Sequence, residues 1–233
     1  MSDDTITDVS SFDFEAWVKF VFDHPFIELP DEKWYWDLNR CFIVTNPRQL
    51  LEHFTRLCRD FPEIAARYSL PQIDQGIWFL LSEPVRCGTY LADASIATGI
   101  KETCVRSMLN VYSGFVAKSN VEVMENCFDM WWDLICGGFW LALAGNPLSA
   151  VPEKNYENLN EDQKAVLNVM LETLTKILEL KEERCIGYAL HGLGHLHHPN
   201  VKIVIQKFID QNREEIPEES LAWVESCRDG TVM

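Results

Sequence analysis

Residues 184–208 read RCIGYALHGLGHLHHPNVKIVIQKF, and this stretch decides the predicted fold. Small and apolar residues come first, then a Leu-Gly step, then Pro199, and finally a run rich in Val and Ile. Glycine permits a tight end to a helix, while Pro199 or Asn200 is suited to begin the next one. The stretch therefore predicts two helices joined by a short turn, and its glycines favour an end to the first helix.

The same helical periodicity runs through most of the chain. Apolar residues recur at i, i+3, i+4, i+7 and i+8, whereas strict period-two alternation is nearly absent, so the predicted class is all-α. Asp13, Asn46 and Asn160 are placed to cap helices, and Gly137-Gly138 is expected to break one. We expect helices over 14–22, from 47 to about 58, and over 62–68, 71–82, 84–96, 99–117, 121–135, 160–178, 181–196, 200–212 and 217–228.

The chain length and composition are typical of a globular protein with a real core. It has 233 residues, of which 47% are hydrophobic and 24% charged. This predicts a single domain over residues 1–233. A polar, proline-containing stretch at 145–158 is the one soft boundary that the sequence offers.

The charge balance restricts the possible partners. Twenty Lys and Arg residues face 36 Asp and Glu residues, which gives a formal net charge of −16. Such a field repels phosphate backbones, so we expect no nucleic-acid partner. It favours association with a basic protein if the acids gather on one face.

The sequence also predicts the compartment. The first residues, MSDD, have neither the basic nor the apolar stretch of a signal peptide. The most apolar segment, 131–145, contains Asp133 and is shorter than the roughly 18 residues that a membrane span needs. The eight cysteines include no Cys-x-x-Cys pair. We therefore expect a cytoplasmic protein with buried, reduced thiols and no membrane contact.

Residues 184–208 resemble the helix–turn–helix unit of HEAT-type repeats. The resemblance rests on an alanine–leucine helix, a Leu-Gly turn, Pro199 and a Val/Ile helix. It implies a right-handed superhelical stack of antiparallel helix pairs, as in HEAT and armadillo proteins. The chain also resembles a group of bacterial proteins of unknown function, through QGIWF at 75–79, MWWD at 130–133 and ALHGLGH at 189–195.

Four of the six histidines lie within residues 191–198. If the helix continued through its glycines, His191 and His195 would share a face at the i, i+4 spacing that suits a zinc or iron pair. Because the two glycines favour a helix end, the simpler interpretation places His191 at a turn and His197 and His198 in solvent. No cofactor is then expected, with Zn or Fe as the alternative.

A second candidate site is the Trp131-Trp132-Asp133 segment. Adjacent helical positions point about 100° apart, so one indole could enter the core while the other faces a groove. Asp133 could orient an indole N–H, hold a histidine or bind a cationic group, and Trp34 and Trp36 could add walls. The alternative is that these tryptophans only fill gaps between helices.

The sequence contains no nucleophile elbow, phosphate-binding loop or dinucleotide fingerprint. The leading hypothesis is therefore a non-enzymatic protein-binding module, in one form an immunity or antitoxin-like protein that caps a basic protein; a homodimer is a further possibility. The alternative is an enzyme or a metal- or ligand-binding protein that uses the segments 131–133 and 191–195 together. That alternative requires the two segments to converge, with His191 and Asp133 no more than about 10 Å apart.

Overall fold

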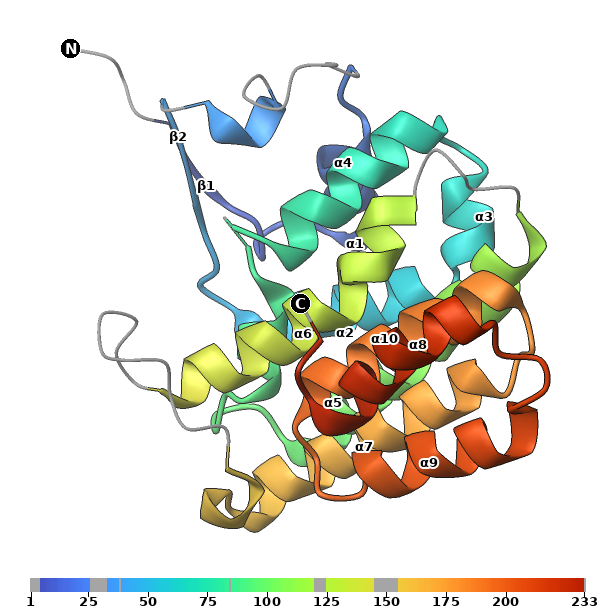
Figure 1. Ribbon diagram of the computed structural model, residues 1–233. Coiled ribbons are helices and arrows are strands. Elements are labelled where there is room, and N and C mark those ends of the chain that lie inside the picture. Colours follow the sequence, from blue (N-terminus) through green and yellow to red (C-terminus); the bar gives the residue numbers. More distant parts are fainter. Residues whose placement is uncertain are drawn as a thin grey trace.

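Most of the chain is folded into helices. The computed structural model describes residues 5–25, 33–37, 39–83, 85–119, 125–144 and 155–232. Within these residues the α-helices are α1 (Phe14–Phe22), α2 (Pro47–Arg59), α3 (Phe61–Ala65), α4 (Leu70–Leu81), α5 (Thr98–Gly114), α6 (Glu125–Leu143), α7 (Glu161–Leu178), α8 (Glu183–Leu196), α9 (Val201–Asn212) and α10 (Glu218–Asp229) (Figure 1). Short 3₁₀ helices lie at η2 (Trp34–Trp36), η3 (Cys87–Leu91), η4 (Val116–Lys118) and η6 (Tyr156–Asn158).

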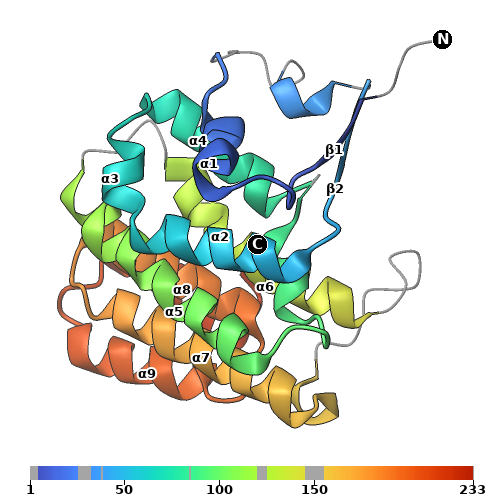
Figure 2. The same cartoon turned by 180° about the vertical axis from the view of Figure 1, so that it is seen from behind.

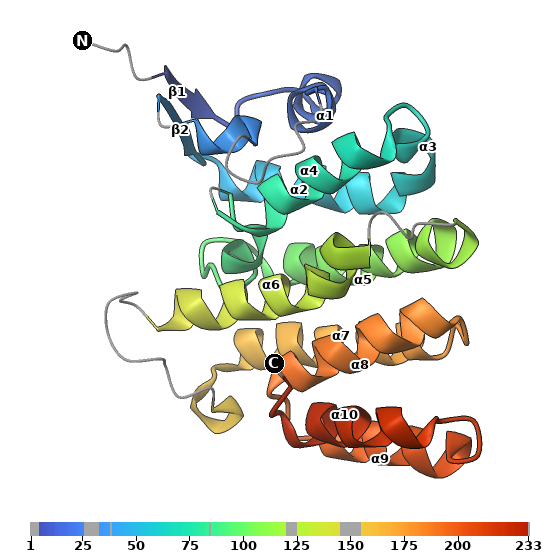
Figure 3. The ribbon, with the colours of Figure 1, turned by 45° about the horizontal axis from the view of Figure 1, so that its top comes forward.

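The helices alternate between two layers along the chain. In one layer α5 packs between α2 and α7, and in the other α6 packs on α4 and α8 while α10 packs on α8. Successive helices also pair across the layers, as in α7 with α8 and α9 with α10. Figure 2 shows the first layer with α9 following α7, and Figure 3 shows the pairs arranged one after another. The expectation of a mostly helical chain with packed helix pairs is confirmed.

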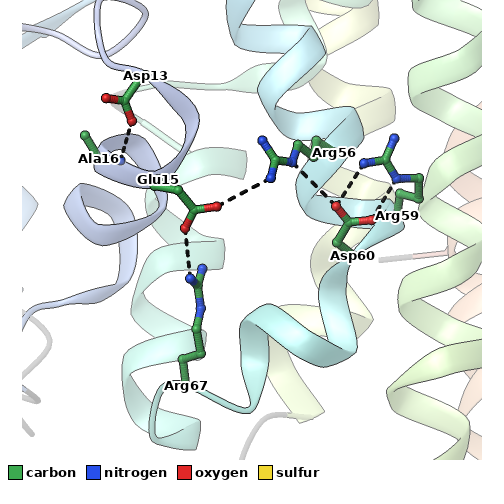
Figure 4. A network of polar contacts seen from close by, with 7 residues as sticks. All are labelled: Asp13, Glu15, Ala16, Arg56, Arg59, Asp60 and Arg67. Atoms are coloured by element: carbon green, nitrogen blue, oxygen red, sulfur yellow. Dashed lines mark hydrogen bonds and ion pairs between the residues drawn. The ribbon is translucent and has the colours of Figure 1, made fainter.

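The predicted helix starts are confirmed where a side chain caps the backbone. The Asp13 carboxylate accepts a hydrogen bond of 2.9 Å from the Ala16 N–H at the start of α1 (Figure 4). Asn46 caps α2 with Pro47 behind it, and Asn160 opens α7 in a capping box. Each cap satisfies backbone donors that would otherwise lack partners and stabilises its helix by about 1 kcal/mol.

An exposed network of ion pairs joins α1 to the segments around α3. Glu15 accepts from Arg56 of α2 at 3.5 Å and from Arg67, which follows α3, at 2.9 Å. Asp60, between α2 and α3, also pairs with Arg56, at 3.6 Å (Figure 4). Because these groups are solvent-exposed, each pair contributes at most about 1 kcal/mol. Within the network, Glu15 and Asp60 each have an arginine of the chain as an ion-pair partner.

Two short strands depart from the predicted all-helical pattern. β1 (Thr5–Asp8) and β2 (Arg40–Ile43) pair in parallel, with Ile6 opposite Cys41. The Asp8 carboxylate closes the corner, because it accepts from the Ser10 N–H at 2.9 Å and from the Thr45 N–H at 3.3 Å. Four-residue strands are too short to show a period-two pattern in the sequence.

Two helix ends expected at glycines, and one expected helix, are wrong. α6 continues through Gly137 and Gly138, and α8 continues through Gly192 and Gly194. The predicted helix 84–96 is instead the short η3. A Cβ on Gly138 would lie 3.0 Å from the backbone of Gly88 in η3, so this glycine permits a close approach of η3 to α6.

One hydrophobic core extends from Val9 to Val232. No helix of the described residues is both long and apolar enough to cross a membrane. The soft boundary expected at 145–158 falls mostly on residues 145–154, which lie outside the described residues; η6 is formed within its described end.

Seven of the eight cysteines are buried, as expected from their apolar surroundings, and only Cys41 on β2 is exposed. Burial raises the pKa of the Cys104 and Cys185 thiols to about 12, which suppresses the reactive thiolate. We expect Ellman's reagent to modify one thiol rapidly in the native protein and the others only after denaturation. The Cys41→Ser variant should lose the fast phase, whereas two or more fast equivalents would contradict this packing.

Candidate functional site

Four polar side chains meet where α6 packs on α8. Asp129 and Asp133 lie four residues apart on α6, and His191 and His195 lie four residues apart on α8. His191 Nδ1 is 3.0 Å from Asp129 Oδ1, and His195 Nδ1 is 3.2 Å from Asp133 Oδ1. The two Nε2 atoms are 3.1 Å apart. We call these four residues the His–Asp cluster.

The hydrogen-bond partners fix the roles of the imidazole nitrogens. A carboxylate only accepts hydrogen bonds, so the Nδ1 atom that faces it carries the proton. Both Nδ1 atoms face a carboxylate. The two Nε2 atoms then face each other without protons of their own. They can share one proton between them, or both can donate their lone pairs to another electron-pair acceptor.

The cluster combines shielded histidines with accessible carboxylates. The His191 side chain is 9% exposed, whereas that of Asp129 is 42% exposed. The hydrogen bond from His191 to Asp129 raises the pKa of this histidine, against an opposing effect of burial. No lysine or arginine of the described residues forms an ion pair with Asp129 or Asp133. The carboxylates thus present negative charge at the surface beside the imidazoles.

The segments 131–133 and 191–195 therefore converge, as the alternative hypothesis requires. Asp133, His191 and His195 were candidates from the sequence, whereas Asp129 was missed. A signal for it was present, because the spacing of Asp129 and Asp133 matches that of the two histidines. What the sequence did not indicate is that α6 and α8 are neighbours.

The tryptophans do not form the expected wall. Trp131 and Trp132 are both 0% exposed, so neither faces a groove, and their burial agrees with the interpretation that they fill gaps between helices. Of the roles considered for Asp133, its position beside His195 agrees with holding a histidine, whereas neither indole Nε1 atom has a hydrogen-bond partner among the described residues. α6 is covered on both sides: Trp131 stacks on Phe54 of α2 at 5.7 Å, while Trp132 lies against Gly192 of α8.

Trp34 and Trp36 belong to a separate aromatic cluster near the N-terminal end of the described chain. Trp34 is buried and stacks on His24, with a ring-centroid distance of 3.7 Å, and it also contacts Phe79 of α4. Trp36 is 47% exposed and packs beside Tyr35. No contact joins these two indoles to the His–Asp cluster in the described residues.

His198 corrects the expectation that the last histidines lie in solvent. It is 5% exposed, its Nε2–H donates to Asn168 Oδ1 at 2.8 Å, and its Nδ1 accepts from the Asn200 N–H at 3.1 Å. Only the neutral imidazole makes both bonds. Burial also lowers the pKa of His198 below the ordinary value of 6.5.

This lowered pKa predicts how His198 affects stability. The unfolded chain binds a proton at His198 more readily than the folded chain, so His198 destabilises the fold as the pH drops below the ordinary histidine pKa. We expect the stability advantage of the wild type over His198→Gln to shrink between about pH 7.5 and pH 5.5. Urea unfolding across this range measures it, and a constant difference would contradict the assigned environment.

Comparisons with known proteins give no assignment for the chain, since no family model, curated protein or solved structure matches it. Within the described residues, no group of three or more His, Cys, Asp or Glu side chains is placed to hold a metal ion. The function of the chain is therefore inferred from its fold and from the His–Asp cluster.

Proposed function

We propose that this chain is a protein-binding module and that its partner is a basic protein. The finer architecture is part of the proposal: a right-handed superhelical stack of antiparallel helix pairs, as in HEAT-type proteins. Such stacks bury a core between neighbouring pairs and use one helix layer to bind a partner. The two packed layers and the net charge of −16 support this function. Capping of a basic toxin by an immunity-like protein is one concrete form.

One observation carries the proposal: the carboxylates of the His–Asp cluster form no ion pair with a Lys or Arg of the described residues. Asp60 and Glu15 are paired with arginines of the chain itself. The only ion-pair partners of Asp129 and Asp133 in the described residues are histidines, and the carboxylates are 42% and 28% exposed. An exposed carboxylate pair without a neighbouring Lys or Arg attracts a cationic side chain of a partner. We therefore place the centre of the interface on the α6–α8 face.

Selection from a random peptide library tests this proposal, because the library samples many partner chemistries at once. The wild-type protein is presented to the library at about pH 8, which lies above the ordinary histidine pKa, and with EDTA present so that metal ions do not bridge. We expect the selected peptides to be rich in Lys and Arg. Their affinity should fall at least about tenfold in the Asp129→Asn/Asp133→Asn variant, because two uncompensated charges are lost.

A charge-matched control separates a specific site from general acidity. Glu214 and Glu215 are exposed and follow α9, so Glu214→Gln/Glu215→Gln removes the same charge elsewhere. This variant should keep the wild-type affinity for the peptides. Peptides without basic residues, or equal losses in both variants, would contradict the proposed interface. If the face instead receives a second copy of the chain, the Asp129→Asn/Asp133→Asn variant would change the sedimentation of the protein alone.

A further inference from the structure

The two imidazoles of the His–Asp cluster are oriented like ligands of a common ion. Histidines that bind a metal usually donate their second N–H to a carboxylate or carbonyl, which fixes the ring and increases the basicity of the ligating nitrogen. His191 has this arrangement through its hydrogen bond to Asp129, and His195 Nδ1 lies 3.2 Å from Asp133 Oδ1 as an ion-pair contact. Their remaining nitrogens, the two Nε2 atoms, lie 3.1 Å from each other.

We infer that His191 and His195 bind one divalent transition-metal ion through their Nε2 atoms, with Asp129 and Asp133 as the outer hydrogen-bond acceptors. The ion belongs to the class that prefers imidazole, which includes Zn²⁺, Ni²⁺, Cu²⁺ and Co²⁺. This metal site depends on the histidine pair, so it does not require that the α6–α8 face binds a protein partner.

The distance between the Nε2 atoms fits a shared metal ion. Two nitrogens at about 2.0–2.1 Å from one zinc ion lie about 2.9 Å apart at a right angle and about 3.3 Å apart at a tetrahedral angle. The observed 3.1 Å lies between these values. The i, i+4 spacing on α8 supplies this separation without a change in the helix, as it does in other helical histidine pairs.

The site is open rather than closed. The two carboxylates lie against the Nδ1 atoms at 3.0 and 3.2 Å, and the described residues offer no set of three protein ligands. Water or an external ligand would fill the remaining positions of the metal ion, as in sites that exchange ligands rather than in closed structural sites. We therefore expect reversible binding that does not determine whether the chain folds.

A zinc titration tests the inference. The protein carries Cys41→Ser, which removes the one exposed thiol, and it has no affinity tag. Calorimetric titration of the metal-free protein with Zn²⁺ should give one saturable site. His191→Ala and His195→Ala should each weaken binding at least about tenfold, and Asp133→Asn by about tenfold, because outer partners typically contribute ten- to a hundredfold. Co²⁺ should give visible absorption that depends on both histidines.

Controls make the outcome decisive. His198→Gln alters a buried histidine outside the cluster and should bind Zn²⁺ like the parent protein. Circular dichroism and thermal unfolding establish that each variant is folded. If His191→Ala fails to fold, His195→Ala and the milder Asp133→Asn carry the test, because both residues are partly exposed. Absence of saturable binding would show that the imidazoles only share a proton, and unchanged affinity in His195→Ala would place the metal elsewhere; either result overturns the inference.

Discussion

We expect Trp131→Ala to lower the free energy of unfolding by about 3–5 kcal/mol, the range for large aromatic residues deleted from a core. Trp131 of α6 is 0% exposed and lies against aromatic rings of the opposite layer, Phe54 of α2 and Tyr112 of α5. Removing the indole leaves a cavity that these rings cannot close. Urea unfolding measures the change, and a loss of several kcal/mol would consume much of the roughly 5–15 kcal/mol that stabilises a typical domain.

Trp36→Ala is the matched control for this prediction. Trp36 is 47% exposed, so its truncation should change the unfolding free energy by less than about 1 kcal/mol. Comparing the unfolding free energies of the two variants distinguishes the effect of a buried tryptophan from that of an exposed one. A small loss in Trp131→Ala would mean that α6 is not covered on its α2 and α5 side, which contradicts the packing of the two layers.

Gly192→Ala should destabilise the protein by about 1–3 kcal/mol or more, the usual effect of overpacking a core. A Cβ at this position would lie 2.4 Å from Trp132 Cβ and 2.9 Å from Leu174 Cδ2. Neither neighbour has room to move aside, because Trp132 and Leu174 are both 0% exposed. The added methyl group therefore pushes α8 away from α6 and α7.

Gly187→Ala provides the control on the same helix. A Cβ on Gly187 would have no heavy atom within 4 Å. Alanine is favoured over glycine by about 1 kcal/mol inside a helix, so this variant should be neutral or stabilised. Thermal and urea unfolding of the two variants side by side measure the contrast. Equal behaviour of Gly192→Ala and Gly187→Ala would show that α6 and α8 do not approach as closely as described.

These glycines show what sequence patterns can and cannot predict here. The periodicity correctly located most helices, and polar caps such as Asp13 located their starts. Local propensity, however, treats every glycine in a helix as a breaker. At Gly138 and Gly192 the contact with η3 or with Trp132 outweighs that local cost. Because those contacts join residues far apart in the chain, no local pattern revealed them.

The candidate site was predictable only in part for the same reason. The i, i+4 histidines were visible in the sequence, but the expectation that α8 ends at its glycines argued against a shared face. Continuation of α8 to Leu196 places His191 and His195 on one face. The pairing with Asp129 and Asp133 depends on the register between α6 and α8, which tertiary packing determines.

The tryptophans illustrate a different limit. Helical spacing predicted that Trp131 and Trp132 point in different directions, and they do. It could not indicate that both directions are covered, one by α2 and α5 and the other by α8. Burial on two sides depends on the number of layers around a helix, and that number is a property of the whole fold.

The central claim is that α6 and α8 hold two imidazoles with their Nδ1 protons on carboxylates and their Nε2 atoms facing each other. Long-range ¹H–¹⁵N NMR of the side chains, on metal-free protein labelled at histidine, tests it most directly. The structure predicts that His191 and His195 both carry a proton on Nδ1. An unprotonated Nδ1 on either ring would contradict the His–Asp cluster and remove the basis for both the interface and the metal site.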